Sequence, residues 1–147
     1  MREILFRGKT NKLDWVYGDL IQLHDGRKFI VNNKFGACID DKGNFINTEA
    51  PFVCSVFPES VYEFTGLTDK NGKKIFEGDI VKHTRTLWGR DDSDIGVILW
   101  CENTCKFYRT SKFDTMEKVE IWKDTAVDYE VIGNVTDNPE MLGGGEE

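Results

Sequence analysis

The chain has 147 residues, of which 39% are hydrophobic and 31% are charged, and this composition excludes a wholly disordered protein. Its 19 lysine and arginine residues against 26 aspartate and glutamate residues give a net charge of −7, which disfavours nonspecific binding to DNA or RNA. No apolar run approaches the ~18 residues of a membrane-spanning helix, and the N-terminus lacks the apolar stretch of a signal peptide. We therefore expect a cytoplasmic protein with no membrane partner.

Short stretches rich in β-branched and aromatic residues predict strands. In chain order these stretches are residues 29–31, 52–53, 61–65, 97–100 and 129–132. Turn sequences separate them at residues 25–26, 41–44 and 71–72, where Asn, Asp and Gly accept the positive φ of tight hairpins. Their close spacing favours antiparallel hairpins over parallel strands with helical crossovers. The sequence predicts a mainly β fold, a small antiparallel barrel or sandwich with SH3-like elements and few short helices.

Helix-forming sequences are scarce. Residues 111–118 fit either a short helix with Ser111 as N-cap or an acidic loop leading into a strand at 119–122. Pro139 can begin one helical turn over residues 138–142. Residues 90–94 predict a charged, solvated loop between strands, because their spacing differs from that of a calcium-binding loop.

Two segments of the chain resemble each other. Residues 15–22 and 75–82 each contain a Gly-Asp pair followed by two aliphatic residues. In both we expect the glycine to permit a bend and the aspartate, Asp19 or Asp79, to accept backbone N–H bonds there. The two aspartates are thus interpreted as turn residues and not as catalytic acids.

The similarity between residues 15–22 and 75–82 leaves two domain organisations open. One is a single β domain over residues 1–142, and the other is a pair of related halves of about residues 1–60 and 61–142. In both cases residues 143–147, rich in glycine and glutamate, form a flexible tail.

The four cysteines are Cys38, Cys54, Cys101 and Cys105. Without a secretory signal we expect reduced thiols that serve as small buried hydrophobic groups. A zinc site built from Cys101, Cys105 and a histidine, His24 or His83, is the alternative, but structural zinc sites usually bring two closely spaced ligand pairs. We therefore predict no metal and no cofactor.

Four segments carry a family pattern. They are residues 2–8, 15–20, 64–81 and 129–142. In this order they resemble the YopX-like proteins of phages and prophages, and the central segment is long enough to be specific. The departures are mild: Phe64 stands where the family often has tyrosine, and Thr136-Asp137 replaces a more usual Tyr-Glu.

The resemblance implies a β-rich phage or prophage protein that acts in the bacterial cytoplasm and self-associates. It implies no established enzyme activity, cofactor or catalytic residue. It marks eight positions as structurally required: Gly66, Asp69, Asn71, Gly72, Gly78, Asp79, Gly133 and Pro139. Local chemistry explains these positions. Asn71-Gly72 is a hairpin turn sequence, and Gly66 and Gly78 fit backbone geometries that a Cβ would strain. Gly133 fits a bulge, and Pro139 ends the last strand.

Three functions are compatible with these observations. The first is a non-enzymatic accessory module that binds a host or phage protein or assembles as a homo-oligomer, with Trp88, Trp100 and Trp122 as candidate interface aromatics and residues 129–135 as a pairing edge.

The second is a nucleic-acid-binding β module. Its candidate footprint is Lys73, Lys74, Lys82, His83, Arg85 and Arg90. The third and least supported is a metal-dependent hydrolase. Its candidate acids are Glu77, Asp91, Asp92 and Asp94.

Overall fold

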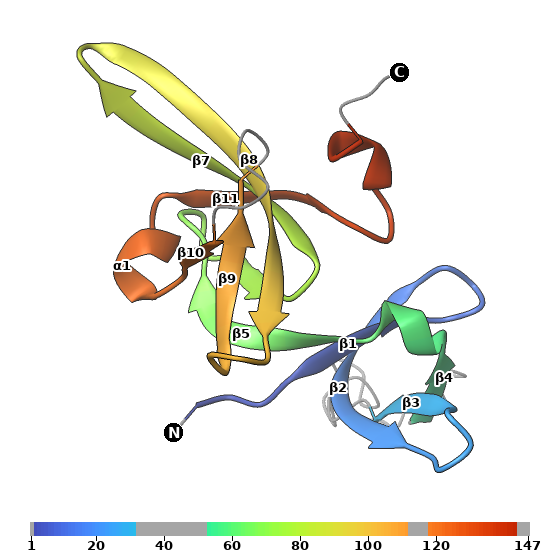
Figure 1. Ribbon diagram of the computed structural model, residues 1–147. Coiled ribbons are helices and arrows are strands. Elements are labelled where there is room, and N and C mark those ends of the chain that lie inside the picture. Colours follow the sequence, from blue (N-terminus) through green and yellow to red (C-terminus); the bar gives the residue numbers. More distant parts are fainter. Residues whose placement is uncertain (1, 32–52, 112–117, 144–147) are drawn as a thin grey trace, which may run out of the picture. The chain divides into compact units, whose positions relative to one another are not determined.

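The computed structural model describes residues 2–31, 53–111 and 118–143 of the chain. Within them the fold is mainly β, as predicted, with two antiparallel sheets and one short α-helix (Figure 1). The strand orders are β4-β3-β2-β1-β5-β6 and β10-β9-β8-β7-β11. Both orders are open-ended, so the described strands form no closed barrel.

The chain divides into two compact units. An N-terminal unit comprises Ile4–Glu63, and a C-terminal unit comprises Phe64–Glu147 together with Met1–Glu3. Whether the two are related halves stays a prediction. No helix in the described part of the chain is long and apolar enough to cross a membrane.

The N-terminal unit is a run of antiparallel hairpins. Its elements are β1 (Phe6–Lys9), β2 (Trp15–Gln22), β3 (Lys28–Val31), β4 (Val53–Val56), the 3₁₀ turn η2 (Pro58–Ser60) and the first residues of β5 (Tyr62–Thr68). Gly26, with a φ of 94°, turns the chain between β2 and β3, which confirms the hairpin predicted there. The predicted turn at 41–44 and Cys38 lie outside the described residues.

The core of this unit is small. Ile30, Cys54 and Val56 are buried, and a Cβ added to Gly8 would lie 2.9 Å from the Val56 side chain, so β1 approaches β4 closely at this glycine. The Arg7 guanidinium lies 4.9 Å from the centre of the Trp15 ring, a cation–π distance.

The two copies of the predicted Gly-Asp motif differ in their surroundings. Gly18 and Asp19 lie inside β2, where they pair with β1 and β3. Gly78 has a φ of 81°, and the Asp79 carboxylate accepts the Phe76 N–H at 2.8 Å. The chain continues as one strand through Gly18-Asp19, and the pairing of β2 passes there from β1 to β3.

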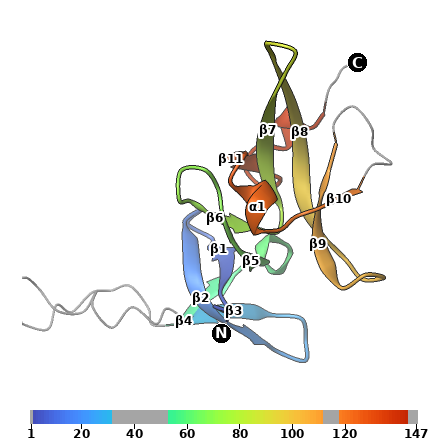
Figure 2. The same cartoon turned by 90° about the vertical axis from the view of Figure 1, so that its left-hand side faces the viewer.

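The C-terminal unit contains the five-stranded sheet and the β5–β6 hairpin (Figures 1 and 2). Its further elements are β6 (Lys74–Phe76), β7 (Asp79–Leu87), β8 (Arg90–Cys101), β9 (Lys106–Thr110), β10 (Lys118–Glu120), α1 (Lys123–Ala126), β11 (Tyr129–Asn134) and η3 (Pro139–Met141). The strands predicted at 61–65, 97–100 and 129–132 are confirmed.

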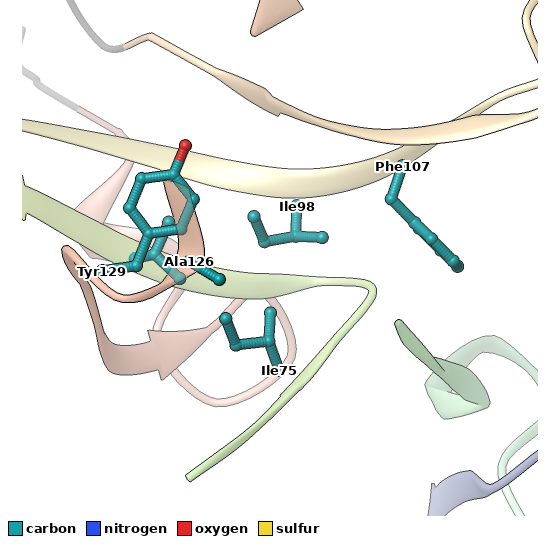
Figure 3. Close-up of a cluster of buried hydrophobic side chains, with 6 residues drawn as sticks. Ile75, Ile98, Phe107, Ala126 and Tyr129 are labelled. Carbon is teal, nitrogen blue, oxygen red and sulfur yellow. The ribbon is translucent and has the colours of Figure 1, made fainter. Parts of the chain in front are cut away.

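One hydrophobic cluster holds this unit together (Figure 3). Its members come from β6, β7, β8, β9, α1 and β11, and they are Ile75, Val81, Ile98, Phe107, Ala126 and Tyr129. Burying each large side chain of this kind contributes about 1.5–3 kcal/mol. The four-residue helix α1 has too few residues to be stable alone, so Ala126 fixes it by packing into the cluster.

Two sequence predictions need correction in this unit. Residues 90–94 form the first half of β8 and not a loop, because the chain turns earlier, at Trp88-Gly89. Pro139 does not end the last strand: β11 ends at Asn134, and Pro139 begins η3, the helical turn predicted there. Residues 112–117 lie outside the described residues, and β10 follows at Lys118.

Candidate functional site

Asp69 organises the turn of the central family segment. Its Oδ1 accepts the backbone N–H of Asn71 at 2.8 Å and that of Lys73 at 2.9 Å, while Oδ2 accepts the N–H of Val131 at 2.9 Å. Burial raises the pKa of Asp69, but these three hydrogen bonds outweigh it, so the pKa lies below the ordinary 3.8. The carboxylate thus joins two family segments that are far apart in the sequence.

The same contacts occupy the outer edge of β11. Besides the bond from Val131 to Asp69, the Lys70 N–H donates to the Tyr129 carbonyl at 2.9 Å. Farther along, the Asn138 N–H donates to the Asn134 carbonyl at 2.8 Å. The interpretation of residues 129–135 as an open pairing edge is therefore wrong.

The remaining motif glycines serve backbone geometry. Gly66, Gly72 and Gly78 have φ values of 89°, 79° and 81°, the left-handed region that disfavours side chains. Gly133 lies where the pairing of β11 with β7 shifts register, and an added Cβ there would lie 2.6 Å from the Asn138 Oδ1. These residues shape the chain and present no reactive group.

A buried ion pair lies beside the hydrophobic cluster. The Arg109 guanidinium donates to Asp94 Oδ2 at 2.9 Å, to the Thr110 carbonyl at 3.1 Å and to the Tyr129 hydroxyl at 3.3 Å. The Arg109 and Asp94 side chains are only 6% and 14% exposed. His83 meets the Tyr129 ring edge-on at 5.2 Å between centroids, so four polar side chains share one site on the sheet.

The sequence analysis missed Arg109, although one residue points to it. A Cβ at Gly96 would overlap the Thr110 carbonyl oxygen and lie 2.9 Å from the Arg109 Cγ. A glycine within a strand-forming stretch often marks such a close approach. Burial and the nearby cations Arg109 and Arg85 lower the pKa of His83, which favours its neutral form in this setting.

The structure does not bring the candidate catalytic acids together. Side chains alternate between sheet faces along β8, so Asp91 lies opposite to Asp92 and Asp94. Asp91 accepts a hydrogen bond from the Thr86 hydroxyl at 2.7 Å, and Asp94 holds Arg109. Across the described ranges, no three His, Cys, Asp or Glu side chains gather as metal ligands would.

The candidate basic footprint is also dispersed. Lys82 lies on the opposite face of β7 from His83 and Arg85, and Lys74 forms an ion pair with Glu3 at 2.6 Å. Arg90 lies at the turn end of β8. No continuous basic face follows from these positions.

A two-stranded arm extends from the five-stranded sheet (Figures 1 and 2). We call residues 84–93 the arm, because they pair with each other beyond the last residues that β11 and β9 contact in the ladder. Every residue of the arm is exposed.

The tip of the arm has an unusual turn. Trp88 and Gly89 have φ values of 54° and 75°, as a two-residue type I′ turn requires. The Trp88 side chain is 100% exposed, whereas Trp100 and Trp122 are 39% and 56% exposed. The prediction that these three tryptophans reach the surface is confirmed.

Comparison with known proteins assigns the family. The family model described as "YopX protein" matches residues 5–143. The chain belongs to the YopX family. Two of its four sequence segments, residues 64–81 and 129–142, are the ones that Asp69 connects in the C-terminal unit.

A solved structure resembles this family member over nearly its whole length. It is the crystal structure of protein EF1440 from Enterococcus faecalis, with a TM-score of 0.54 and 19% sequence identity. The similarity covers 97% of this chain and 99% of that chain, and at this identity it concerns the fold alone. No curated protein matches the chain.

Proposed function

We propose that this YopX family member is a non-enzymatic protein-binding module, that its contact element is the arm, and that the partner is a second copy of the same chain. The observation that carries the proposal is Trp88, a fully exposed tryptophan with positive φ at the arm tip. The candidate acids support the non-enzymatic part, because Asp94 and Asp91 are engaged by Arg109 and Thr86.

Two features of Trp88 are unfavourable for the stability of the isolated chain. Type I′ turns favour Asn, Asp or Gly, and a bulky side chain in the left-handed region is strained. A fully exposed indole also contributes no burial. Strained residues concentrate at binding sites, and tryptophan is enriched among the residues that dominate binding energy. A contact that buries Trp88 explains both features.

Charge favours a second copy as the partner. The chain carries −7, so most pairs of identical surfaces bring acidic groups together. The arm is balanced, with Arg85 and Arg90 against Asp91 and Asp92. Two arms can therefore meet without net repulsion.

The β7 edge of the arm suits this contact better than the β8 edge. In a two-fold antiparallel pairing centred on Thr86, Thr86 faces its own copy and Arg85 faces Leu87 of the second copy. A two-fold pairing of the β8 edge centred on Asp91 or Asp92 places that aspartate against its own copy, which is repulsive. The β7 pairing satisfies exposed backbone groups and brings the two tips onto the partner arms.

The test is the mass in solution by size-exclusion chromatography with light scattering, at tens of micromolar protein. We expect wild type at twice the 16.9 kDa chain mass, and Trp88→Asn at the monomer mass. Asparagine suits the turn, so this variant removes the indole without straining the backbone.

The chain offers a matched control in Leu13→Asn. Leu13 is also large, 67% exposed and at positive φ, 66°, but it lies in the N-terminal unit. We expect this variant to stay dimeric. A monomeric wild type, or a dimeric Trp88→Asn variant, overturns the proposal. A salt-dependent shift of labelled DNA that Arg85→Ala and Arg90→Ala abolish would instead support the nucleic-acid alternative.

A further inference from the structure

The strands of the N-terminal unit have a buried face and an outward face. Burial alternates along β4, where Val56 is buried and its neighbour Ser55 is exposed. Gly8 of β1 lies so close to β4 that an added Cβ would meet the Val56 side chain. Arg7 and Lys9, on either side of Gly8, therefore lie on the outward face.

Aromatic side chains flank these two cations. The register pairs Lys9 with Trp15 of β2. It pairs Arg7 with Tyr17 of β2 and with Tyr62 of β5. Directly opposed residues of an antiparallel pair project from the same face, so two cations of β1 lie between aromatic residues of β2 and β5. Tyr17 is 43% exposed, whereas Trp15 and Tyr62 are half-buried.

Cation–π contacts hold this arrangement in place. The Arg7 guanidinium lies 4.9 Å from the centre of the Trp15 ring and 5.5 Å from that of the Tyr62 ring. The Lys9 ammonium lies 5.6 Å from the centre of the Trp15 ring. Arg7 is only 6% exposed and supports the rings, whereas half-buried Lys9 keeps surface for a ligand. Rings and charge that are positioned in advance reduce the cost of ordering them on binding.

The acidic charge of the chain lies mainly outside this unit. Residues 4–63 contain seven lysine and arginine residues against eight aspartate and glutamate residues, which is −1 of the −7 of the whole chain. Along β2, Asp14 precedes Trp15 and Asp19 lies two positions beyond Tyr17. A polyanion that crosses the strands between these carboxylates meets the two cations of β1.

We propose that the outward face of β2, β1 and β5 binds single-stranded nucleic acid, with bases stacked on the Tyr17 and Trp15 rings and a phosphate at Lys9. Exposed aromatic rings beside cations on a sheet match the two chemical parts of a nucleotide, its flat base and its phosphate. An acidic peptide would match Lys9 alone and leave the rings without a function. The proposal is independent of the arm, which lies in the C-terminal unit.

The test is the fluorescence anisotropy of a labelled oligothymidylate of about 16 nucleotides, the upper site size of a small β module. We expect the full chain to bind it saturably, more weakly as salt rises, and to bind the duplex of the same length less tightly. Tyr17→Leu should raise the Kd at least about fivefold, which is the loss of one stacked base, whereas Tyr17→Phe should retain the affinity. Wild type and Trp88→Asn should bind alike, so the result does not depend on contacts of the arm.

Charge variants provide a matched control. Lys9→Gln should lower the slope of log Kd against log salt concentration by about 0.7, the value for one phosphate contact on a single strand. Lys28→Gln should leave the slope unchanged, because Lys28 pairs with Val56 on the buried face.

Four results would overturn the proposal. They are an anisotropy that stays constant at tens of micromolar protein, equal Kd values for wild type and Tyr17→Leu, displacement by polyglutamate as effective as by unlabelled oligothymidylate, and binding that Arg85→Ala and Arg90→Ala abolish. The third result would assign the face to acidic peptides, and the fourth would assign nucleic-acid binding to the arm.

Discussion

The base and the arm of the β7–β8 hairpin share the same antiparallel pairing but differ in burial. At its base, residues 80–83 pair with 94–97, and Ile80, Val81 and Val97 are buried. In the arm, residues 84–93 have the same antiparallel pairing but are all exposed. The ladder is continuous, so pairing alone does not distinguish the halves.

Neighbouring strands make the difference. β11 accompanies β7 only as far as His83, and β9 accompanies β8 only from Ile98. A two-stranded ribbon without a third strand is marginally stable in water. The base therefore holds the C-terminal unit together, while the arm tolerates substitutions and can retain a strained, exposed tryptophan.

The largest expected effect comes from breaking the buried pair at the base. Arg109→Met leaves Asp94 buried without its cation, which should cost about 3–5 kcal/mol of unfolding free energy. Arg85→Met, on the arm, should change it by less than about 0.5 kcal/mol. Urea denaturation of both variants gives the comparison.

A double variant separates the ion pair from simple packing. Arg109→Met with Asp94→Leu removes both charges, so it should recover much of the loss of Arg109→Met alone. If the double variant recovers none of the lost unfolding free energy, the guanidinium stabilises the fold through Tyr129 and Thr110 rather than through Asp94.

An intermediate effect is expected at Asp69, which holds β11 against the base. An asparagine there cannot accept hydrogen bonds on both sides, so at least one of the three N–H groups loses its acceptor. We expect Asp69→Asn to cost about 1–3 kcal/mol near neutral pH.

The pH dependence tests the same carboxylate. Because its folded pKa lies below 3.8, the unfolded chain binds more protons, and its contribution is present above 3.8 and lost as the pH falls through the folded value. The difference in unfolding free energy between wild type and Asp69→Asn should therefore decrease as the pH falls below 3.8. If this difference in unfolding free energy stays constant below pH 3.8, the charge of Asp69 contributes nothing to the stability of the fold.

The hydrogen bonds of Asp69 show which contacts the sequence could predict and which it could not. The turn at Asn71-Gly72 was predictable because its chemistry is local: Gly72 supplies the positive φ, and Asp69 bonds two and four residues ahead. The bond from Asp69 to Val131 was not, because it joins positions 62 residues apart. The family pattern included both segments but not their contact.

The errors have a common cause. Residues 90–94 were predicted as a loop because they are polar, yet an exposed two-stranded arm is polar on both faces and keeps its pairing. The turn was missed because Trp-Gly is not a favoured type I′ sequence. Likewise Arg109 was missed because an arginine among aromatic residues in a strand resembles an outward-facing residue. At these places strand pairing and burial override local preference.

The smallest expected effect concerns the arm tip. Trp88→Asn should leave the free energy of unfolding unchanged or raise it by up to about 0.5 kcal/mol, because Asn accepts a positive φ and no packed contact is lost. Leu13→Asn, at a φ of 66° in the N-terminal unit, should behave alike. The measurement belongs at a protein concentration low enough to dissociate dimers, since dimerisation would stabilise wild type and Leu13→Asn but not Trp88→Asn. A loss of 1 kcal/mol or more in Trp88→Asn would mean that the indole packs on its own chain, and the arm would then be part of the folded core.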